Sequence, residues 1–380
     1  RAKINMSSPN MVMRDPVIYR SMISNHHRTG DAWKIYPMYD WTHGESDYIE
    51  QVSHSLCTLE FEPHRELYDW FLDSIGPLKG IRPKQREFSR LNLSYTITSK
   101  RNLARLVEEK LVDGWDDPRM PTISGLRNRG YSPESLKMFA LTVGVSKRES
   151  VIDVSLLEFC ARAHLNEVAP RAMAVINPLK LTITNYEDKA FEEIKFEINP
   201  QKKEIGARKI KFSKTIYIER DDFKEAADDN FFRLKTGGEV RLKNAYIIKA
   251  TEVLKDDKGE VVEVLCEYDK KSKSGSNTPE SNRKVKGTIH WVSATYSVDA
   301  KINIYDRLFK VSEPGKEKDL LADINEDSLH VFEAKVEPHL QGSKEGEKFQ
   351  FQRIGYFVRT ANKKTLEFNK TVGLRDGWKK

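Results

Sequence analysis

The chain has 380 residues, of which 38% are hydrophobic and 32% are charged, so it holds enough apolar material for the cores of two or three domains. Its 64 basic and 57 acidic side chains give a net charge of +7, which permits a polyanionic partner without requiring one. No apolar run approaches the roughly 20 residues that cross a bilayer, no signal peptide opens the chain and the three cysteines form no Cys-x-x-Cys pair, so we expect no membrane role, no disulfide framework and a cytoplasmic location.

Helical patterning dominates the chain up to about residue 165, after a short strand predicted at residues 11–13. Apolar residues recur at near-helical spacing over 103–111. A second helix is predicted to begin at Ser132-Pro133-Glu134, because proline is favoured in the first turn and the apolar residues of 136–143 then share one face.

Strand patterning replaces the helical pattern beyond Asn177. Short strands separated by turns at this spacing favour β-barrels. The lysine- and serine-rich run at 270–277 has loop composition, and we interpret it as a mobile hairpin tip. The apolar runs lie at 210–218, 246–248, 261–265 and 289–292, with a turn sequence at 256–259.

Four short blocks follow one another in order along the first third of the chain. A tripeptide such as Ser-Lys-Arg occurs by chance in many basic proteins, so the order of the blocks carries more weight than any single one. The blocks are Tyr39-Asp40-Trp41-Thr42-His43, His54-Ser55-Leu56-Cys57-Thr58-Leu59-Glu60-Phe61, Thr98-Ser99-Lys100-Arg101 and Gly114-Trp115-Asp116-Asp117-Pro118-Arg119-Met120-Pro121-Thr122.

This ordered set resembles the second half of the catalytic domain of class I glutaminyl-tRNA synthetases, and the resemblance continues to Val372-Gly373-Leu374-Arg375-Asp376. It implies a multidomain α/β plus all-β protein. A partial Rossmann-type catalytic domain with the acceptor-stem region is expected at 1–100, a helical subdomain after the Ser-Lys-Arg loop at 101–168, and two anticodon-binding β-barrels at 169–380. The early His-Ile-Gly-His signature of the class has no counterpart in this sequence, and the chain opens without Met. We therefore expect a carboxy-terminal portion that lacks the first half of the catalytic domain and is inactive by itself.

The loop at 98–101 is the candidate for the activation chemistry. Joining a carboxylate to ATP adds negative charge at phosphorus, and a fixed cation near the departing pyrophosphate lowers the barrier. By resemblance, Lys100 is that cation, Ser99 donates to the same phosphates and Arg101 supports the charge of the loop, while Thr98 stands where the family usually has Met. The resemblance implies ATP with Mg²⁺, and no structural metal is predicted because His26-His27 has no ligands at suitable spacing.

A pocket that selects glutamine needs neutral donors and acceptors for the side-chain amide and must reject the carboxylate of glutamate. By resemblance, Tyr39 contacts the amide, Gln85 belongs to the polar network around it and Cys57 lines the wall. Thr42 and His43 are similar to residues that shape the adenylate site. The structural alternatives are a core aromatic at Tyr39 and a buried small hydrophobe at Cys57.

The acceptor end of tRNA is expected against Glu60 and Phe61. Pro63 stands where bacterial relatives have an acidic residue, and its side chain neither donates nor accepts a hydrogen bond to a base edge. Arg119, with Arg127 and Arg129, is predicted either to hold phosphates or to pack against carboxylates.

The barrels are expected to bind the anticodon. Single-stranded RNA is distinguished by stacking its bases on aromatic or guanidinium planes and by hydrogen-bonding their edges. Phe232 replaces a basic residue of bacterial relatives, which exchanges a phosphate contact for stacking. The residues at matching positions are Asn166, Arg171, Arg233, Arg241, Gln350 and Arg353.

The sequence as a whole predicts part of a glutamine–tRNA ligase whose partners are the tRNA for glutamine, ATP and L-glutamine. One alternative is the eukaryotic and archaeal type of glutamyl-tRNA synthetase, which shares the barrels; the neutral pocket around Tyr39 and Cys57 argues against it. The other alternative is a non-catalytic tRNA-binding module.

Overall fold

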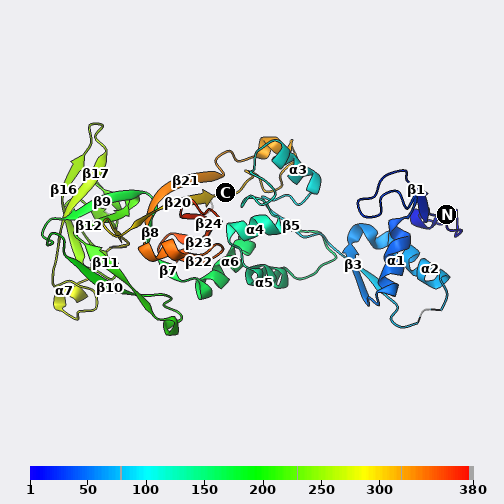
Figure 1. The fold of residues 1–380 in the computed structure, drawn as a ribbon, viewed down its shortest axis with the longest axis horizontal. Coiled ribbons are helices and arrows are strands. Elements are labelled where there is room, and N and C mark those ends of the chain that lie inside the picture. Colours follow the sequence, from blue (N-terminus) through cyan, green and yellow to red (C-terminus); the bar gives the residue numbers. More distant parts are fainter. Residues whose placement is uncertain (78, 229, 318, 376–380) are drawn as a thin grey trace. The chain divides into compact units, whose positions relative to one another are not determined.

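The computed structural model describes residues 1–77, 79–228, 230–317 and 319–375. Asp376, the last residue of the expected resemblance, lies outside this range. The chain divides into two compact units, Arg1–Asn92 with Val143–Ile152, and Leu93–Thr142 with Asp153–Lys380 (Figure 1). Residues 93–100, which we expected in the first domain, belong to the second unit.

The first unit is built on a βαβ element. Strands β3 (His54–Thr58) and β4 (Lys84–Phe88) pair in parallel, and the chain between them forms η2 (Leu59–His64) and α2 (Arg65–Ser74). Helix α2 buries Leu67, Tyr68, Phe71 and Leu72, whose spacing places them on one side of the helix. A parallel strand pair with a helical crossover is the repeating element of α/β nucleotide-binding folds. The other elements are β1 (Tyr19–Ser21), β2 (Ile35–Pro37) and α1 (Tyr39–Ile49).

The strand predicted at 11–13 is wrong. Met11–Met13 forms a 3-10 turn, η1, because the side chain of Asn10 accepts a hydrogen bond from the amide of Val12 and caps it. Met13 is buried beside Ala2, Leu67 and Phe71. The apolar pattern that suggested a strand therefore reflects burial of one methionine in the core of the first unit.

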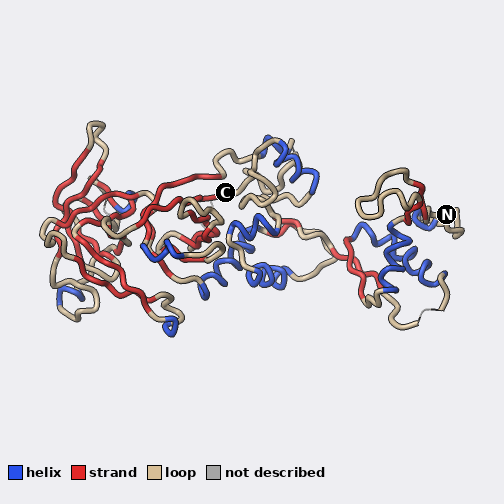
Figure 2. Tube along the Cα trace, in the orientation of Figure 1, coloured by secondary structure: helices blue, strands red, loops and turns tan. Residues whose placement is uncertain are grey.

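The helices of the second unit precede its two large sheets, and Figure 2 shows this change from helix to strand along the chain. Leu103, Leu106 and Met120 are buried with Leu308 and Phe309, so α3 shares a core with a segment far along the chain. The predicted helix start at Ser132-Pro133-Glu134 is confirmed, with α5 beginning at Pro133. The helices here are α3 (Lys100–Glu108), α4 (Ile123–Arg129), α5 (Pro133–Val143) and α6 (Val154–Val168). The short strands β5 (Asn92–Leu93) and β6 (Val151–Ile152) pair where the chain passes from one unit to the other.

The first large sheet has seven strands in the order β18-β15-β16-β17-β9-β12-β19. Its core is centred on Trp291, Phe196 and Phe212, all almost fully buried. The sheet strands are β9 (Pro178–Ile183), β12 (Thr215–Glu219), β15 (Glu239–Leu242), β16 (Ile247–Lys255), β17 (Val261–Tyr268), β18 (Thr288–Ile289) and β19 (Val292–Ser293). Beside it lie the hairpin β10 (Phe191–Glu197) and β11 (Ala207–Ser213), η3 (Lys203–Ile205), η4 (Arg220–Asp222), the pair β13 (Phe223–Lys224) and β14 (Leu234–Lys235), and α7 (Pro279–Asn282).

The second large sheet also has seven strands, in the order β7-β22-β23-β24-β20-β21-β8. Phe351, Phe357 and Phe368 form its core, with ring centroids of Phe351 and Phe357 4.4 Å apart. The elements are β7 (Arg171–Ala172), β8 (Ala174–Val175), β20 (Val298–Tyr305), η5 (Leu320–Asp323), β21 (Leu329–Val336), η6 (Pro338–Gly342), β22 (Lys348–Phe351), β23 (Gly355–Arg359) and β24 (Glu367–Gly373). The expected combination of an α/β part with two β-sheet domains is confirmed.

The interpretation of 270–277 as a hairpin tip is wrong. The hairpin of β16 and β17 turns at Asp256 and Gly259 instead, as the turn sequence there predicts. Ser272 is fully buried, and its hydroxyl accepts a hydrogen bond from the amide of Ile247. The run is therefore tied to the sheet by backbone polar groups that its composition does not reveal. Within the described ranges, no helix has the length and apolar character needed to span a membrane.

Candidate functional site

Among the clefts of the second unit, two carry the predicted anticodon residues, and four of the six line the first of them. This first cleft has a volume of about 820 Å³, and Asn166, Arg171, Gln350 and Arg353 contribute to its wall. Strands β7 and β22 run parallel with Gln350 opposite Arg171, so the sheet register itself brings these two side chains to one edge. Residues far apart in the sequence are thus assembled at a single surface.

A hydrogen-bonded network fixes the polar side chains of the first cleft. The amide nitrogen Nε2 of Gln350 donates to the hydroxyl of Tyr356 at 3.0 Å, and that hydroxyl lies 3.2 Å from Oδ1 of Asn166. Arg171 is 5% exposed and donates to Oδ1 of Asn166 and to the carbonyl of Ala169. Burial lowers the pKa of Arg171, yet a guanidinium remains a cation at neutral pH. The network therefore presents preoriented donors beside one cation.

Lys243 is a further cation of the first cleft, and no pattern in the sequence singled it out. It precedes Asn244 in the turn between β15 and β16, and both residues line the cleft. Burial and the nearby Arg353 lower the pKa of Lys243. A partly desolvated lysine is suited to an anionic partner, because its charge is poorly screened there.

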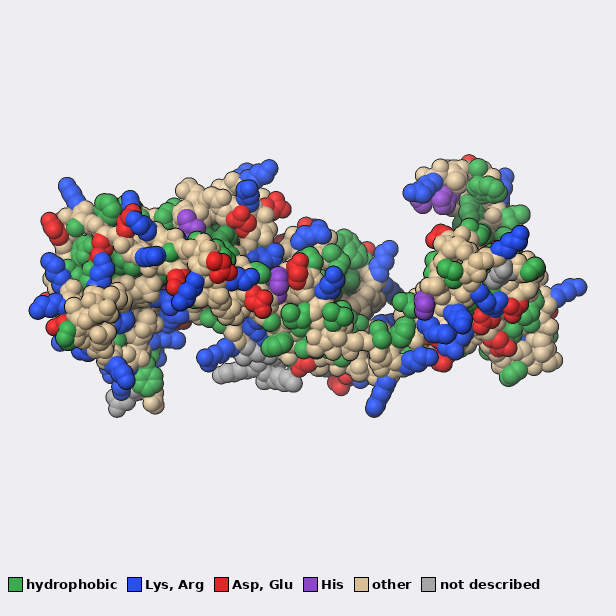
Figure 3. All heavy atoms as spheres, turned by 90° about the horizontal axis from the view of Figure 1, so that it is seen from below, with side chains coloured by type: hydrophobic (Ala, Val, Ile, Leu, Met, Phe, Trp, Pro, Cys, Tyr) green, Lys and Arg blue, Asp and Glu red, His purple; other side chains and the backbone are tan. Residues whose placement is uncertain are grey.

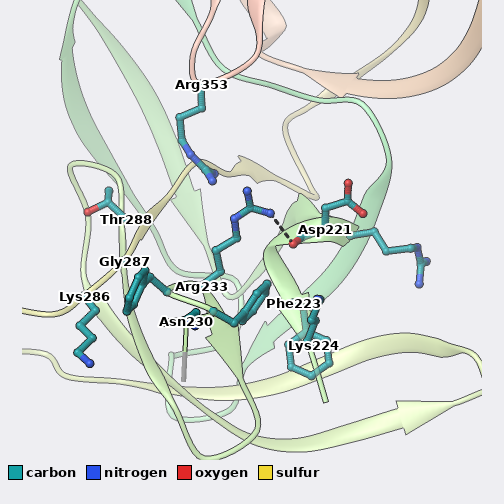
Figure 4. Close-up of a pocket in the computed structure, with 12 residues that line it drawn as sticks. Asp221, Phe223, Lys224, Asn230, Arg233, Lys286, Gly287, Thr288 and Arg353 are labelled. Atoms are coloured by element: carbon teal, nitrogen blue, oxygen red, sulfur yellow. Dashed lines mark hydrogen bonds between the residues drawn. The ribbon is translucent and has the colours of Figure 1, made fainter. Parts of the chain in front are cut away.

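The second cleft has a volume of about 810 Å³ and combines aromatic rings with cations (Figure 4). Phe232 is 51% exposed, and the ammonium of Lys286 lies 5.4 Å from its ring centroid. Lys224 and Arg233 lie 5.0 and 6.0 Å from the ring of Phe231. Exposed rings flanked by cations suit the stacking of unpaired bases next to phosphates.

Gly287 sets the shape of the second cleft. A Cβ atom at this position would lie 2.1 Å from the carbonyl oxygen of Phe232, a separation that real atoms do not adopt. Only glycine therefore allows the strand beside Thr288 to approach the Phe232 segment so closely. In Figure 4, the side chains of Arg353 and Arg233 extend toward each other in the second cleft.

The structure does not bring every predicted tRNA residue to these clefts. The guanidinium of Arg241 donates to the carbonyls of Ser272, Ser281 and Arg283 and thereby fastens the 270–283 loop. Arg119 forms a two-pronged pair with Asp117 and also donates to Ser328. These two arginines thus have structural contacts in the described part of the chain. Of the two others considered for phosphates, Arg129 donates to the carbonyls of Tyr305 and Thr371, while Arg127 is exposed.

The first unit gathers the predicted amino-acid pocket. The ring of Tyr39 stacks on His43 with centroids 5.2 Å apart and lies 5.3 Å from Phe61. Burial and the neighbouring Cys57 and aspartates raise the pKa of Tyr39, so its hydroxyl remains protonated at neutral pH. Burial likewise raises the pKa of the half-buried thiol of Cys57. Around Tyr39 the groups thus include a neutral hydroxyl and a neutral thiol, together with two aspartates.

Gln85 is held beneath this group by Glu87, a residue that the sequence did not single out. Nε2 of Gln85 donates to the carbonyl of Phe61 and to Oε1 of Glu87, each at 2.9 Å. The side chain of Glu87 is fully buried and pairs with Arg65. That pairing, against the opposing effect of burial, lowers the pKa of Glu87 to about 2. In β4, Gln85 and Glu87 are buried and alternate with exposed residues, as expected for side chains that point to opposite faces of a strand.

The remaining predicted site residues are exposed or locally bonded. Thr42 donates its hydroxyl to the carbonyl of Met38 at 3.1 Å, and Glu60 forms an exposed ion pair with Arg90. Ser99 is the N-cap of α3, and Lys100 and Arg101 begin that helix with exposed side chains. Ser99, Lys100 and Arg101 belong to the second unit, whereas Tyr39 belongs to the first.

Charge alone does not mark the clefts. Figure 3 shows basic and acidic side chains interspersed over the face of the barrels that it presents. The clefts therefore stand out by their combination of amides, rings and buried cations and not by a continuous basic surface.

Comparison with known proteins agrees with this architecture. Residues 1–167 match the family described as tRNA synthetases class I (E and Q), catalytic domain. Residues 169–269 and 288–360 match two families described as the anti-codon binding domain of the same synthetases. Fold and sequence together define a class I aminoacyl-tRNA synthetase of the type that serves glutamate and glutamine.

Individual relatives narrow this class. The chain is 52% identical over 383 residues to the glutamine–tRNA ligases of Cronobacter sakazakii and Vibrio vulnificus, with 100% of this chain and 68% of each relative covered. It is 51% identical over 385 residues to that of Rhodopirellula baltica, of which it covers 63%. The chain belongs to the glutamine–tRNA ligase family, as the resemblance in its sequence indicated.

Proposed function

We propose that these 380 residues bind the tRNA for glutamine through the two barrel clefts and supply the glutamine pocket of an ATP-dependent glutamine–tRNA ligase. The observation that carries the proposal is the convergence of Asn166, Arg171, Gln350 and Arg353 on one cleft. Amide and guanidinium groups at a single edge can hydrogen-bond the edge of an unpaired base, while the neighbouring aromatic cleft offers a stacking surface.

The pocket of the first unit supports glutamine as the amino acid. The hydroxyl of Tyr39 and the thiol of Cys57 are neutral, and the carbonyl oxygen of Gln85 adds an acceptor for an amide N–H. A glutamate carboxylate would meet the neighbouring aspartates, while the guanidinium of Arg65 is already paired with Glu87. The same observation disfavours the glutamyl-tRNA synthetase alternative.

Activation would join the carboxylate of glutamine to the α-phosphorus of ATP and release pyrophosphate. In this proposal Lys100 neutralises charge on the departing phosphates, Ser99 donates to them and Arg101 adds to the local field. Their place at the start of α3 suits anions, because the first amide groups of a helix have no intrahelical acceptor. Bound Mg²⁺ would accompany ATP as part of the substrate.

We also propose that the acceptor stem contacts Glu60 and Phe61. Phe61 lies beside Tyr39, which would place the tRNA terminus next to the amino acid. Pro63 gives that segment no side-chain hydrogen bond, so Glu60 and Glu62 are the acidic groups available there for base edges.

We further propose that the 380 residues alone do not activate glutamine, because the relatives extend beyond the matched region by about a third of their length. Measurement of glutamine-dependent ATP–pyrophosphate exchange tests this directly, with a full-length relative as the positive control. No exchange is expected from the purified chain. Sustained exchange would show that the chain is catalytically complete.

A further inference from the structure

One buried carboxylate joins the arginines of the two clefts. Asp222, the last residue of η4, is 2% exposed. Its two oxygens accept from NH1 and NH2 of Arg353 at 2.5 and 2.7 Å. The same carboxylate lies 3.4 Å from Nε of Arg233. Arg353 lines both clefts and Arg233 lines the second, so Asp222 contacts a cation of each.

The backbone at Arg353 needs such an anchor. Arg353 has a φ of +68° in the turn between β22 and β23, a conformation that costs energy for any residue with a Cβ. Its guanidinium also approaches Nδ1 of His290 at 3.0 Å, while Nε2 of His290 lies 2.7 Å from the carbonyl of Ala174. These contacts fix the direction in which Arg353 leaves a strained turn.

A purely structural ion pair accounts poorly for this arrangement. One carboxylate faces two guanidinium groups, and the nearby carboxylate of Glu219 lies 3.4 Å from His290 instead. Both arginines keep open faces, with 31% of the side chain of Arg353 and 46% of that of Arg233 exposed. Buried ion pairs contribute little net stability but hold their members in one geometry. Geometry is what hydrogen bonding to a base edge requires.

We propose that Asp222 is a positioning residue for base recognition, which aligns Arg353 and Arg233 together so that the two clefts recognise neighbouring anticodon bases as one unit. This inference rests on the proposed tRNA binding. Asp222 itself touches no RNA, since its carboxylate is buried and both oxygens are occupied. Loss of its charge would therefore loosen both arginines, whereas loss of Arg233 would affect the second cleft alone.

The test uses Asp222→Asn, which keeps the shape and removes the charge. Asp257→Asn is the matched control, because Asp257 is exposed in the turn between β16 and β17, lines neither cleft and changes the net charge equally when substituted. Binding of the 380-residue chain is measured with the glutamine tRNA and with three tRNAs that each carry one substituted anticodon base. The quantity compared is the ratio of dissociation constants between substituted and matched tRNA at each position.

For Asp222→Asn, the ratio is expected to fall about tenfold at two neighbouring anticodon positions, as for loss of a good base-edge contact at each. Asp257→Asn should keep all three ratios. Asp222→Glu, which retains the charge, should lower the ratios at the same two positions by less, and it carries the test if the asparagine variant does not fold.

Three outcomes contradict the inference. Uniformly weaker binding of all four tRNAs with unchanged ratios would make Asp222 a structural residue only. A ratio lost at a single position would show that the clefts act separately. Absence of discrimination by the unaltered chain would overturn the proposed function as well, and this result is distinct from the other two because it appears without any substitution.

Discussion

Gln350 in β22 lies directly opposite Arg171 in β7. These two strands pair in parallel at the edge of the second large sheet. The backbone N–H of Gln350 donates to the carbonyl of Pro170 at 2.9 Å, which ties β22 to the residue just before β7. The sheet register thus sets the distance between an amide and a guanidinium group. Recognition of a base by this pair would depend on strand pairing and not on a flexible loop.

Arg171→Ala is expected to reduce discrimination between matched and anticodon-substituted tRNA by about 1–3 kcal/mol. The guanidinium would no longer orient Asn166 or present its cation to the first cleft. Arg241→Ala is the control, because that arginine fastens the 270–283 loop. Fluorescence titration of the 380-residue chain with both tRNAs gives the ratio. Equal losses for both tRNAs would assign Arg171 to phosphate contact instead.

Apolar alternation predicted the barrels, because it is a local feature, while the family resemblance supplied four residues that line the first cleft. The sequence did not predict Asp222, Lys243 or Glu87, whose roles arise from partners distant in the chain: Arg353 for the first two and Arg65 for Glu87. Composition also misled at 270–277, since buried serines there bond backbone groups of the sheet. Tertiary hydrogen bonds of this kind leave no periodic trace in a sequence.

Tyr39→Phe, made in a full-length form, is expected to erode the preference for glutamine over glutamate. The phenol hydroxyl would be lost while the ring packing on His43 and Phe61 remains. Sites that hydrogen-bond a substrate group discriminate strongly against analogues that leave the partner unpaired. The measurement is kcat/KM for activation with each amino acid. Tyr39 is 53% exposed and so is not the core aromatic of the alternative interpretation. Unchanged discrimination accompanied by lower stability would show that its hydroxyl only supports local packing.

Lys100→Ala, again in a full-length form, is expected to slow activation much more than it raises KM for glutamine. A cation that contacts the departing pyrophosphate stabilises charge mainly in the transition state. Arg105→Ala is a suitable control, since Arg105 lies in the same helix and forms an exposed ion pair with Asp319. Pre-steady-state exchange kinetics separate the two parameters. An effect confined to KM would show that Lys100 does not stabilise the transition state.

The ion pair of Glu87 is expected to make the stability of the first unit depend on pH. Its pKa is about 2 in the folded chain against 4.5 for the free group, so its contribution to stability is present above about pH 4.5 and is lost as the pH falls toward 2. About 2 kcal/mol is expected, allowing for the partial exposure of Arg65.

Hydrogen exchange of the β3, β4 and α2 amides at pH 7 and pH 3 measures this contribution. Glu87→Gln should lower protection at pH 7 and should abolish most of the difference between the two pH values. Glu62→Gln serves as the control, because Glu62 is exposed and lies 4.0 Å from the same arginine. Equal pH dependence in the Glu87 variant and the unaltered chain would contradict the assignment.

The most direct test of the account is titration of the unaltered 380-residue chain with glutamine tRNA and with an anticodon-substituted tRNA at two salt concentrations. Phosphate contacts release counterions, so affinity for both tRNAs should fall as salt rises. Base-edge contacts in the first cleft should keep the matched tRNA bound more tightly at both concentrations. Equal affinity for the two tRNAs at both salt concentrations would contradict anticodon recognition by these clefts, even if the chain still bound RNA.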